Sequence, residues 1–218
     1  MESKYFDLLD DETIKFITRT EAFYPADAIN APIEKQREYY NALCREFDTG
    51  YPEGVTAKDR TITDGDVSFQ VRDYVKSGVE PRAHVLFFHG GGFVVGGLES
   101  HDSICAEFCD GTNCLLTSVD YRMAPEYLHP ASFQDCLTSF NQLTLMTDLP
   151  IVLAGDSAGG NLAAAVAHAV REQVPTSQPL NGRSSQMNRR RQLERPERRM
   201  ESPLGEPMPL WRQRKRGP

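Results

Sequence analysis

A serine set between two glycines is the first feature of the sequence that could do chemistry. Ser157 lies in the run GDSAG (155–159), which follows the apolar run IVLA (151–154) and precedes an alanine-rich stretch. A serine on a sharp turn between a strand and a helix is strained, and its hydroxyl is presented to a substrate. The N–H of Ala158, at the start of that helix, would face an oxyanion that develops during acyl transfer. The alternative is a chance turn, because G-x-S-x-G also occurs by accident.

A run of three glycines supplies a second element of the same chemistry. It lies in HGGGF (89–93), at the end of the apolar run HVLFFH (84–89). Glycines allow backbone N–H groups to turn toward a pocket, as an oxyanion hole requires. The alternatives are a flexible loop and a phosphate cradle. A cradle would be followed by Lys and then Ser or Thr, whereas VVGGLES (94–100) contains no lysine. Two elements of acyl transfer, each at the end of a predicted strand, favour the catalytic interpretation.

Three motifs in this order resemble a known family. HGGGF (89–93), SVDYRMAPEYLHPA (118–131) and GDSAGGNLA (155–163) are similar to the hormone-sensitive-lipase-like branch of the α/β-hydrolases, which includes bacterial acetyl esterases. The stretch IEKQREYYNALCREF (33–47) resembles the N-terminal cap of those esterases. The resemblance covers residues 1 to about 173.

The resemblance implies a function and a set of site residues. Ser157 would be the nucleophile, and Gly90, Gly91 and Gly92 would form the oxyanion hole with Ala158. The family hydrolyses esters with short acyl chains and needs no metal or organic cofactor. The expected partner is therefore a small-molecule ester.

The elements that must position these residues are predicted from hydrophobic patterning. Short, nearly continuous apolar runs indicate strands buried on both faces, and helical stretches separate them, which is typical of a mainly parallel α/β sheet. Acids in a first turn and Pro32 mark the starts of two N-terminal helices. The predicted strands are 60–63, 67–75, 84–89, 115–119 and 151–154, and the predicted helices are about 10–17, 32–47, 100–111, 131–147 and 158–173.

The remaining members of a catalytic triad are missing after the serine. In α/β-hydrolases the order along the chain is Ser, then Asp or Glu, then His. After Ser157 the chain has no Asp, and its only histidine is His168. Eleven residues along one helix separate the two side chains by roughly 16 Å, too far for a hydrogen bond. The sequence therefore predicts an α/β-hydrolase core truncated after the helix that follows Ser157, with little esterase activity and with IVLA at an exposed apolar edge.

Composition divides the chain into two parts of opposite charge. The net charge of −7 combines −14 over residues 1–173 with +7 over residues 174–218. The second part contains seven of the 14 prolines and few aliphatic residues, so it is predicted to be a disordered Arg/Pro-rich tail. The predicted organisation is N-terminal cap-like helices (1–50), a partial hydrolase core (51–173) and the tail (174–218).

Composition also excludes several classes of protein. No apolar run approaches the ~20 residues of a membrane-spanning helix. The N-terminus has no basic and apolar leader, and five cysteines is an odd number, so a reduced, cytoplasmic setting is expected. The sequence predicts no membrane partner and does not favour a nucleic-acid arm, because the basic tail has one aromatic residue and accompanies an acidic body. The oligomeric state is not predicted.

Other clusters of polar residues carry weaker signals. His101, Cys105, Cys109 and Cys114 could be written as a zinc site, but they lack a C-x₂-C pair. The first three recur every fourth residue on one predicted helix, which is more typical of a buried helix face. Arg122 and Glu126 are expected to brace the loop after residue 119. Asp135 and Asp156 are expected to be carboxylates near the site, and His129 and Asp120 are expected to have no role in a triad. The alternative function is a non-catalytic binding or regulatory protein that keeps the acyl pocket.

Overall fold

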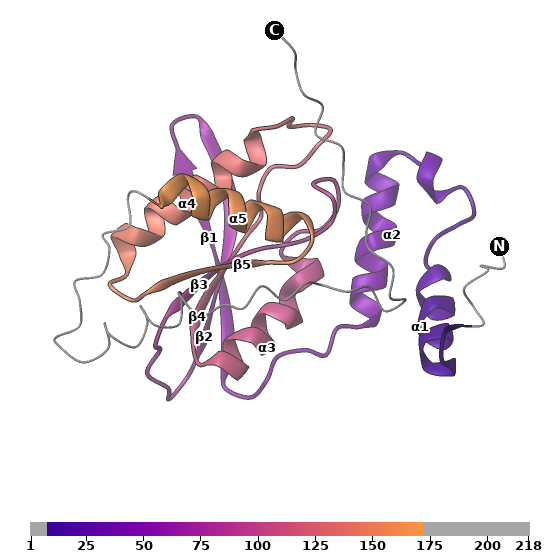
Figure 1. The fold of residues 1–218 in the computed structure, drawn as a ribbon, viewed down its shortest axis with the longest axis horizontal. Coiled ribbons are helices and arrows are strands. Elements are labelled where there is room, and N and C mark those ends of the chain that lie inside the picture. The colour runs from indigo at the N-terminus through magenta and orange to yellow at the C-terminus, as the bar shows by residue number, and fades with distance from the viewer. Residues whose placement is uncertain (1–7, 172–218) are drawn as a thin grey trace, which may run out of the picture. The chain divides into compact units, whose positions relative to one another are not determined.

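The computed structural model describes residues 8–171 of the chain, and a five-stranded sheet forms its centre (Figure 1). The strand order is β1-β2-β4-β3-β5; β1 and β2 form an antiparallel hairpin, β2 pairs antiparallel with β4, and β4, β3 and β5 are parallel. The bounds are β1 Val55–Asp64, β2 Val67–Lys76, β3 His84–Phe88, β4 Leu115–Val119 and β5 Ile151–Gly155.

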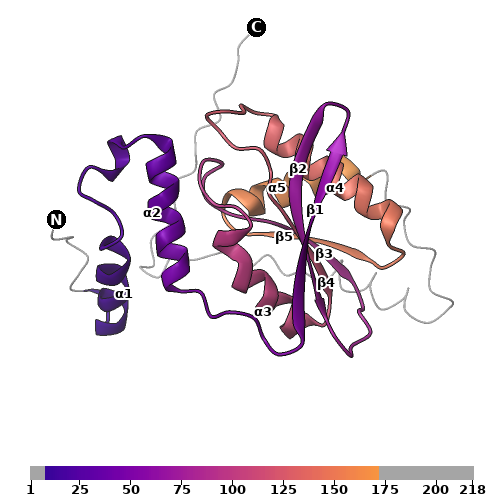
Figure 2. The same cartoon turned by 180° about the vertical axis from the view of Figure 1, so that it is seen from behind.

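Helices cover both faces of this sheet (Figures 1 and 2). Helix α3 (Asp102–Thr112) packs on one face, while α4 (Ala131–Met146) and α5 (Ala158–Val170) pack on the other. Side chains from the two faces of each strand form two separate apolar cores, and this is the layered arrangement that alternating strands and helices produce. The predicted α/β class is confirmed, with a mixed sheet in which the central strands are parallel.

The buried strand β3 positions the glycine run beside the turn around Ser157. All five of its residues are buried; Leu86 and Phe88 face α4 and α5, whereas Val85 and Phe87 face α3. Phe88 is in register with Val119 of β4 and with Gly155 of β5. The carboxyl ends of the three parallel strands therefore lie together at one edge of the sheet, the carboxyl edge, where the glycine run and the serine turn both begin.

Two helices and a short turn precede the sheet. Helix α1 (Asp11–Glu21) is capped by Asp10, whose carboxylate accepts the N–H of Thr13 at 2.7 Å. Helix α2 (Ile33–Glu46) begins after Pro32, as predicted. The ion pair between Arg19 and Glu46 at 2.5 Å joins the two helices. Two 3₁₀ turns, η2 (Ala28–Asn30) and η3 (Glu99–His101), complete the described elements.

Two sequence predictions need correction. Strand β1 begins at Val55, five residues before the predicted start, because its first half carries exposed polar side chains that hide the strand pattern. The prediction that β5 is buried on both faces, like β3, is wrong, because Val152 is 45% exposed. The prediction that IVLA forms an exposed edge is confirmed, because β5 is the outermost strand of the described sheet. An apolar run alone does not reveal where a strand lies in the sheet.

Two further predictions concern membranes and the tail. Between residues 8 and 171, no helix is long and apolar enough to cross a membrane. The predicted disordered tail (174–218) lies outside the described residues.

Candidate active site

The turn around Ser157 has the geometry of a nucleophile elbow. Ser157 is exposed and lies between β5 and α5 with φ 48° and ψ −115°, a conformation that L side chains rarely adopt. A Cβ on Gly155 would lie 2.5 Å from the carbonyl oxygen of Phe88, and one on Gly159 would collide with the same oxygen. Only glycine therefore permits the close approach of β3 to this turn. The carbonyl of Asp156 accepts the N–H of Gly159 at 2.7 Å and holds the start of α5.

The Ser157 hydroxyl has no hydrogen-bond partner within residues 8–171. His168 lies on the last turns of α5, exposed, where it contacts Arg171 at 2.7 Å. The predicted separation of His168 from Ser157 follows from their places on α5, which Ser157 caps, and no described histidine hydrogen bonds to Ser157. The described part of the chain thus places no base within hydrogen-bond distance of the Ser157 hydroxyl.

The glycine loop, residues 90–97, carries the backbone amides that could stabilise an oxyanion. Gly91 and Gly92 have φ 118° and 62°, and the carbonyl of Gly91 accepts the N–H groups of Val94 and Val95. The N–H of Gly90 is already donated to Asp156 Oδ1 at 2.8 Å. Within residues 8–171, the N–H groups of Gly91, Gly92 and Ala158 have no hydrogen-bond acceptor. Of the four predicted donors, Gly90 therefore anchors the loop and three amides remain available.

His89 supports the start of the glycine loop. Its ring is fully buried and stacks on Tyr121 with a centroid distance of 4.2 Å and an interplanar angle of 7°. Burial lowers the pKa of His89 to about 4, so the ring is neutral near pH 7, and its Nδ1 donates to the carbonyl of Gly90 at 2.8 Å. The Tyr121 hydroxyl donates to the carbonyl of His89 at 2.6 Å.

The residues weighed as a zinc site lie in two different environments. Cys105, Cys109 and Cys114 are buried in the apolar core beneath α3, and the Cys109 thiol donates to the carbonyl of Cys114. His101 instead places Nε2 3.3 Å from Oδ1 of Asp156, the residue before Ser157. Within the described residues, no group of three or more His, Cys, Asp or Glu side chains could hold a metal ion. The contact of His101 with Asp156 joins residues 55 positions apart, so the spacing of residues along the chain does not predict this contact.

Arg37 of α2 connects the N-terminal helices to the carboxyl edge. Its guanidinium donates to the carbonyls of Val94 and Ala124 at 2.8 and 3.0 Å and forms a bidentate pair with Glu126. Glu126 thus braces the loop after β4, as predicted, but its partner was not foreseen.

Arg122 braces the same loop through a different contact. Its guanidinium pairs with Asp135 at 2.8 Å, and Asp135 is 1% exposed. Asp135 was expected near the site; it is committed to Arg122 and has no contact with Ser157. His129 and Asp120 likewise make no contact with Ser157.

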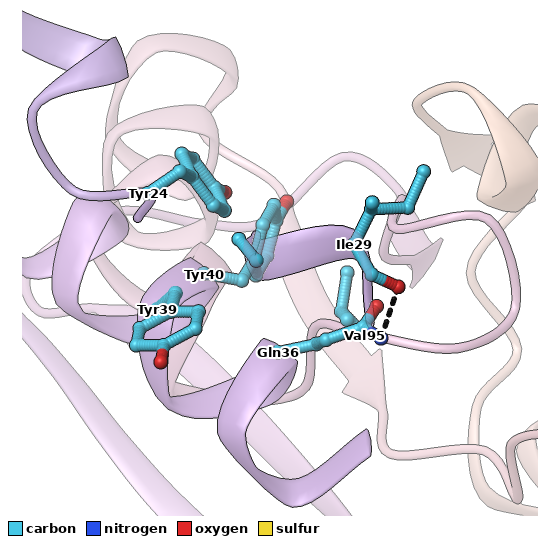
Figure 3. A pocket seen from close by; sticks show the side chains of 7 residues that line it. Tyr24, Ile29, Gln36, Tyr39, Tyr40 and Val95 are labelled. Atoms are coloured by element: carbon cyan, nitrogen blue, oxygen red, sulfur yellow. Dashed lines mark hydrogen bonds between the residues drawn. The ribbon is translucent and has the colours of Figure 1, made fainter. Parts of the chain in front are cut away.

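Two cavities adjoin these loops. One of about 370 Å³ lies between α2, η2 and the glycine loop; Figure 3 shows tyrosine rings and apolar side chains around it. Its lining residues are Tyr24, Ala28, Ile29, Gln36, Tyr39, Tyr40 and Val95. The second, of about 360 Å³, is lined by Gly92 and by Asn161, whose N–H donates to the carbonyl of Ser157. Apolar and aromatic side chains therefore line both cavities, and each cavity includes a residue of the glycine loop.

The tyrosine cavity is coupled electrostatically to the serine turn. Burial raises the pKa of the Tyr40 hydroxyl, and its hydrogen bond with Cys44 and the charge of Asp156 act in the same direction. Burial also raises the pKa of the Cys44 thiol. Both groups are therefore neutral near pH 7, and Asp156 is the negative charge that they face.

This geometry defines a class of protein: a hydrolase fold with a serine on the strand–helix turn and a glycine loop beside it. Residues 85–200 match the alpha/beta hydrolase fold family, and the chain belongs to that family. The match extends beyond residue 173, where the resemblance drawn from motifs ended.

Two curated relatives are named as ester-hydrolysing enzymes or lipases. The chain is 42% identical over 133 residues to lipase 2 of Moraxella sp. (strain TA144), covering 55% of this chain and 31% of that protein. It is 31% identical over 173 residues to the carboxylic ester hydrolase LipN of Mycobacterium tuberculosis (strain ATCC 25618 / H37Rv), covering 75% and 46%. The chain thus spans less than half of the length of each of these two relatives.

A solved structure shows the same arrangement. The hyperthermophilic esterase from the archaeon Pyrobaculum calidifontis superimposes with a TM-score of 0.66 at 27% identity, covering 76% of this chain and 55% of that one. The family assignment is therefore to the alpha/beta hydrolase fold, and this solved esterase shares that fold.

Proposed function

We propose that the chain carries the acyl-transfer half of a serine carboxylesterase for small esters with short acyl chains. Ser157 is the nucleophile, and the free N–H groups of Gly91, Gly92 and Ala158 form the oxyanion hole. The observation that carries the proposal is the conformation of Ser157, at φ 48° on the turn between β5 and α5, beside three amides without an acceptor among the described residues. Gly90 belongs to the same loop, but its N–H holds Asp156 rather than the substrate.

The reaction follows from these groups. The Ser157 oxygen attacks the ester carbonyl carbon, and the carbonyl oxygen takes up negative charge that the amide donors stabilise. The proton that leaves the Ser157 hydroxyl passes to water, the C–O bond to the alcohol breaks, and the departing alkoxide takes a proton from water. Water then hydrolyses the acyl-serine to the free acid and restores the Ser157 hydroxyl. None of these steps requires a metal or an organic cofactor. The family resemblance and the two cavities of about 370 and 360 Å³ favour small esters.

Removal of the serine proton limits this chain. A serine hydroxyl is a weak nucleophile without an adjacent base, and His168 is the only histidine after Ser157. Amide donors and substrate binding alone leave roughly 10³–10⁴-fold catalysis over the reaction in water. We therefore propose slow acylation by the 218-residue chain, in a cytoplasmic setting.

The second candidate is a non-catalytic binding or regulatory protein that keeps the acyl pocket. The absence of a base at the Ser157 hydroxyl within residues 8–171 favours this function. The two candidates differ in whether Ser157 ever becomes acylated or phosphonylated.

A fluorophosphonate probe distinguishes these candidates. We expect slow labelling of the purified chain at Ser157, slow hydrolysis of p-nitrophenyl acetate, and neither reaction in Ser157→Ala. The matched control is Ser77→Ala, an exposed serine directly after β2, which lies by the amino end of β4. Rapid, Ser157-dependent hydrolysis would contradict the proposed slow acylation. No labelling after prolonged incubation would contradict the esterase and favour the binding protein.

A further inference from the structure

The glycine loop is held at both of its ends by side-chain groups. At its start, Gly90 donates its N–H to Asp156 Oδ1 at 2.8 Å. At its end, Gly97 donates its N–H to Ser100 Oγ at 3.0 Å. A Cβ on Gly90 would collide with the Asp156 carboxylate, so the loop touches the serine turn without space between them. The amides of Gly91 and Gly92 lie between these two anchors.

One buried imidazole joins the two anchors. His101 Nε2 lies 3.3 Å from Asp156 Oδ1, the same oxygen that accepts the N–H of Gly90. His101 Nδ1 lies 2.8 Å from Ser100 Oγ, the same oxygen that accepts the N–H of Gly97. The His101 side chain is only 6% exposed. A single ring thus contacts both acceptors that fix the loop.

The chemistry of the partners determines the tautomer of this ring. An ionised carboxylate only accepts hydrogen bonds, so Nε2 carries the proton that faces Asp156. Nδ1 of the neutral ring is then an acceptor, and the Ser100 hydroxyl donates to it. Burial lowers the pKa of His101, while Asp156 opposes that shift, so the neutral form predominates near pH 7.

The groups that face His101 come from four neighbouring segments. Asp156 lies on the serine turn, and the neutral His89 ring has its centroid 5.7 Å away. Helix α2 packs against η3 and contributes Tyr40 and Cys44, which are neutral near pH 7. On its own segment, Glu99 and Asp102 are paired with Arg72. Asp156 is therefore the one charge that acts directly on the imidazole among the described residues.

We propose that His101 is a positioning residue that ties both ends of the glycine loop to the nucleophile turn through Asp156 and Ser100. Its catalytic meaning depends on the proposed function, because the loop amides matter only where an oxyanion forms. The hydrogen-bond network itself does not depend on that function and can be tested without any turnover.

Protonation of His101 would rearrange the network in a defined way. The imidazolium donates from Nδ1 to Ser100 Oγ, so the Ser100 proton can no longer point at the ring. The carbonyl of Gly97 lies 3.0 Å from Ser100 Oγ and accepts that proton instead. The chemical environment of Gly97 therefore changes with the charge of a histidine that it does not touch.

An NMR titration of the ¹⁵N-labelled 218-residue chain tests this coupling. Between pH 4 and 8 we expect the Gly97 amide resonance to shift with the same midpoint as the His101 imidazole. In Ser100→Ala the midpoint of His101 should remain visible while the shift at Gly97 disappears. His168→Gln, which removes an exposed histidine of α5, is the control and should leave both curves unchanged. A Gly97 shift that persists in Ser100→Ala, or no Gly97 shift while His101 titrates, would overturn the proposal.

Amide hydrogen exchange at pH 7 tests the other anchor. We expect His101→Phe, which keeps an aromatic ring, to accelerate exchange at Gly90 and Gly97 by roughly threefold to tenfold. His101→Gln, which keeps an N–H donor for Asp156, should restore the Gly90 rate. Equal rates at Gly90 in the wild type and His101→Phe would overturn the proposal, as would a uniform acceleration of all amides in both variants. If His101→Phe does not fold, the hydrogen-exchange rate of Gly90 in His101→Gln and the NMR titration of Ser100→Ala still test the proposal.

The two proposals fail separately. Absence of fluorophosphonate labelling together with an intact Gly97 titration would remove the esterase and keep the network. Labelling at Ser157 with no response of Gly90 or Gly97 to the His101 variants would keep the esterase and remove the positioning role.

Discussion

Strand β3 has a buried histidine at each end, and their surroundings differ. His84 begins the strand and hydrogen bonds through Nε2 to the Thr117 hydroxyl at 2.8 Å, and Thr117 donates to Asp73. His89 follows the strand, stacks on Tyr121 and donates to the carbonyl of Gly90. Each ring leaves one nitrogen buried without a partner among the described residues, His84 Nδ1 and His89 Nε2.

The difference lies in what each histidine holds. At the amino end of β3, side chains hold other side chains on regular strands: Arg60 pairs with Asp73 at 2.6 Å. At the carboxyl end, side chains hold the backbone of a loop with positive φ angles at Gly91, Gly92 and Phe93. Hydrogen bonds at the first end contribute stability. Those at the second also fix the direction of amide N–H groups, and that is where a catalytic role can arise.

The largest expected effect is at the carboxyl edge. We expect Gly159→Ala to lower the free energy of unfolding by about 3 kcal/mol or more, because its Cβ would collide with the carbonyl oxygen of Phe88. Gly111→Ala in α3 is the matched control: a Cβ there meets no atom within 4 Å, so the change should stabilise by about 0.5–1 kcal/mol. Urea unfolding measures both. Equal midpoints for the two variants would contradict the close approach of β3 and the serine turn.

The second prediction compares the two histidines by pH. Burial lowers the pKa of His84, and that of His89 to about 4, below the value of 6.5 that an unfolded chain would have. The unfolded state therefore binds more protons in this range, and stability is lost as the pH falls from about 6.5 toward 4. His89 alone accounts for about 3 kcal/mol of that loss.

Variants assign this pH dependence to each ring. Urea midpoints measured from pH 7 to pH 4 should fall less steeply in His89→Gln than in the wild type, and His84→Gln should flatten the curve by a smaller amount. If His84→Gln flattened the pH dependence of stability more than His89→Gln does, the assignment of the larger pKa shift to His89 would be wrong.

The sequence predicted the elements better than the contacts between them. The runs HVLFF and LLTSV predicted β3 and β4 to within one residue, because strands buried on both faces are mainly apolar. The order of strands depends on pairing between distant segments, so the exposed edge at β5 was predicted from the family resemblance and not from the residues of the strand itself. The start of β1 was missed because an edge strand with charged side chains lacks that signal.

The candidate site shows the same limit. The glycines and Ser157 were predicted because the backbone conformation they require restricts the local sequence. His101 and Arg37 were not predicted as parts of the site, because each acts on residues more than 50 positions away. The use of the Gly90 N–H by Asp156 was also missed, since a run of three glycines does not indicate which amide remains free.

The third prediction concerns the amino end of β3. We expect Thr117→Val to lower stability by about 1–2 kcal/mol, because His84 and Asp73 each lose a buried hydrogen bond. Thr117→Ser keeps the hydroxyl and is the control, with a smaller loss. Neither variant should change the rate of Ser157 labelling. Slower labelling in Thr117→Val at equal folded fraction would show that the two ends of the strand are coupled.

The smallest expected effect tests how α2 holds the carboxyl edge. Lysine is a point charge that cannot serve the two carbonyls and the carboxylate contacted by Arg37, so Arg37→Lys should lower stability by about 1 kcal/mol. The control is Arg19→Lys: the Arg19 side chain is 56% exposed in its pair with Glu46, so its loss should stay below about 0.5 kcal/mol. Thermal unfolding measures both, and hydrogen exchange should be faster at Val94 and Val95 only in Arg37→Lys. Arg37 binds the glycine loop through the Val94 carbonyl, so unchanged exchange at Val94 and Val95 would contradict a restraint by α2. The loop would then be held by His89, His101 and Asp156 alone, and α2 would only line the cavity.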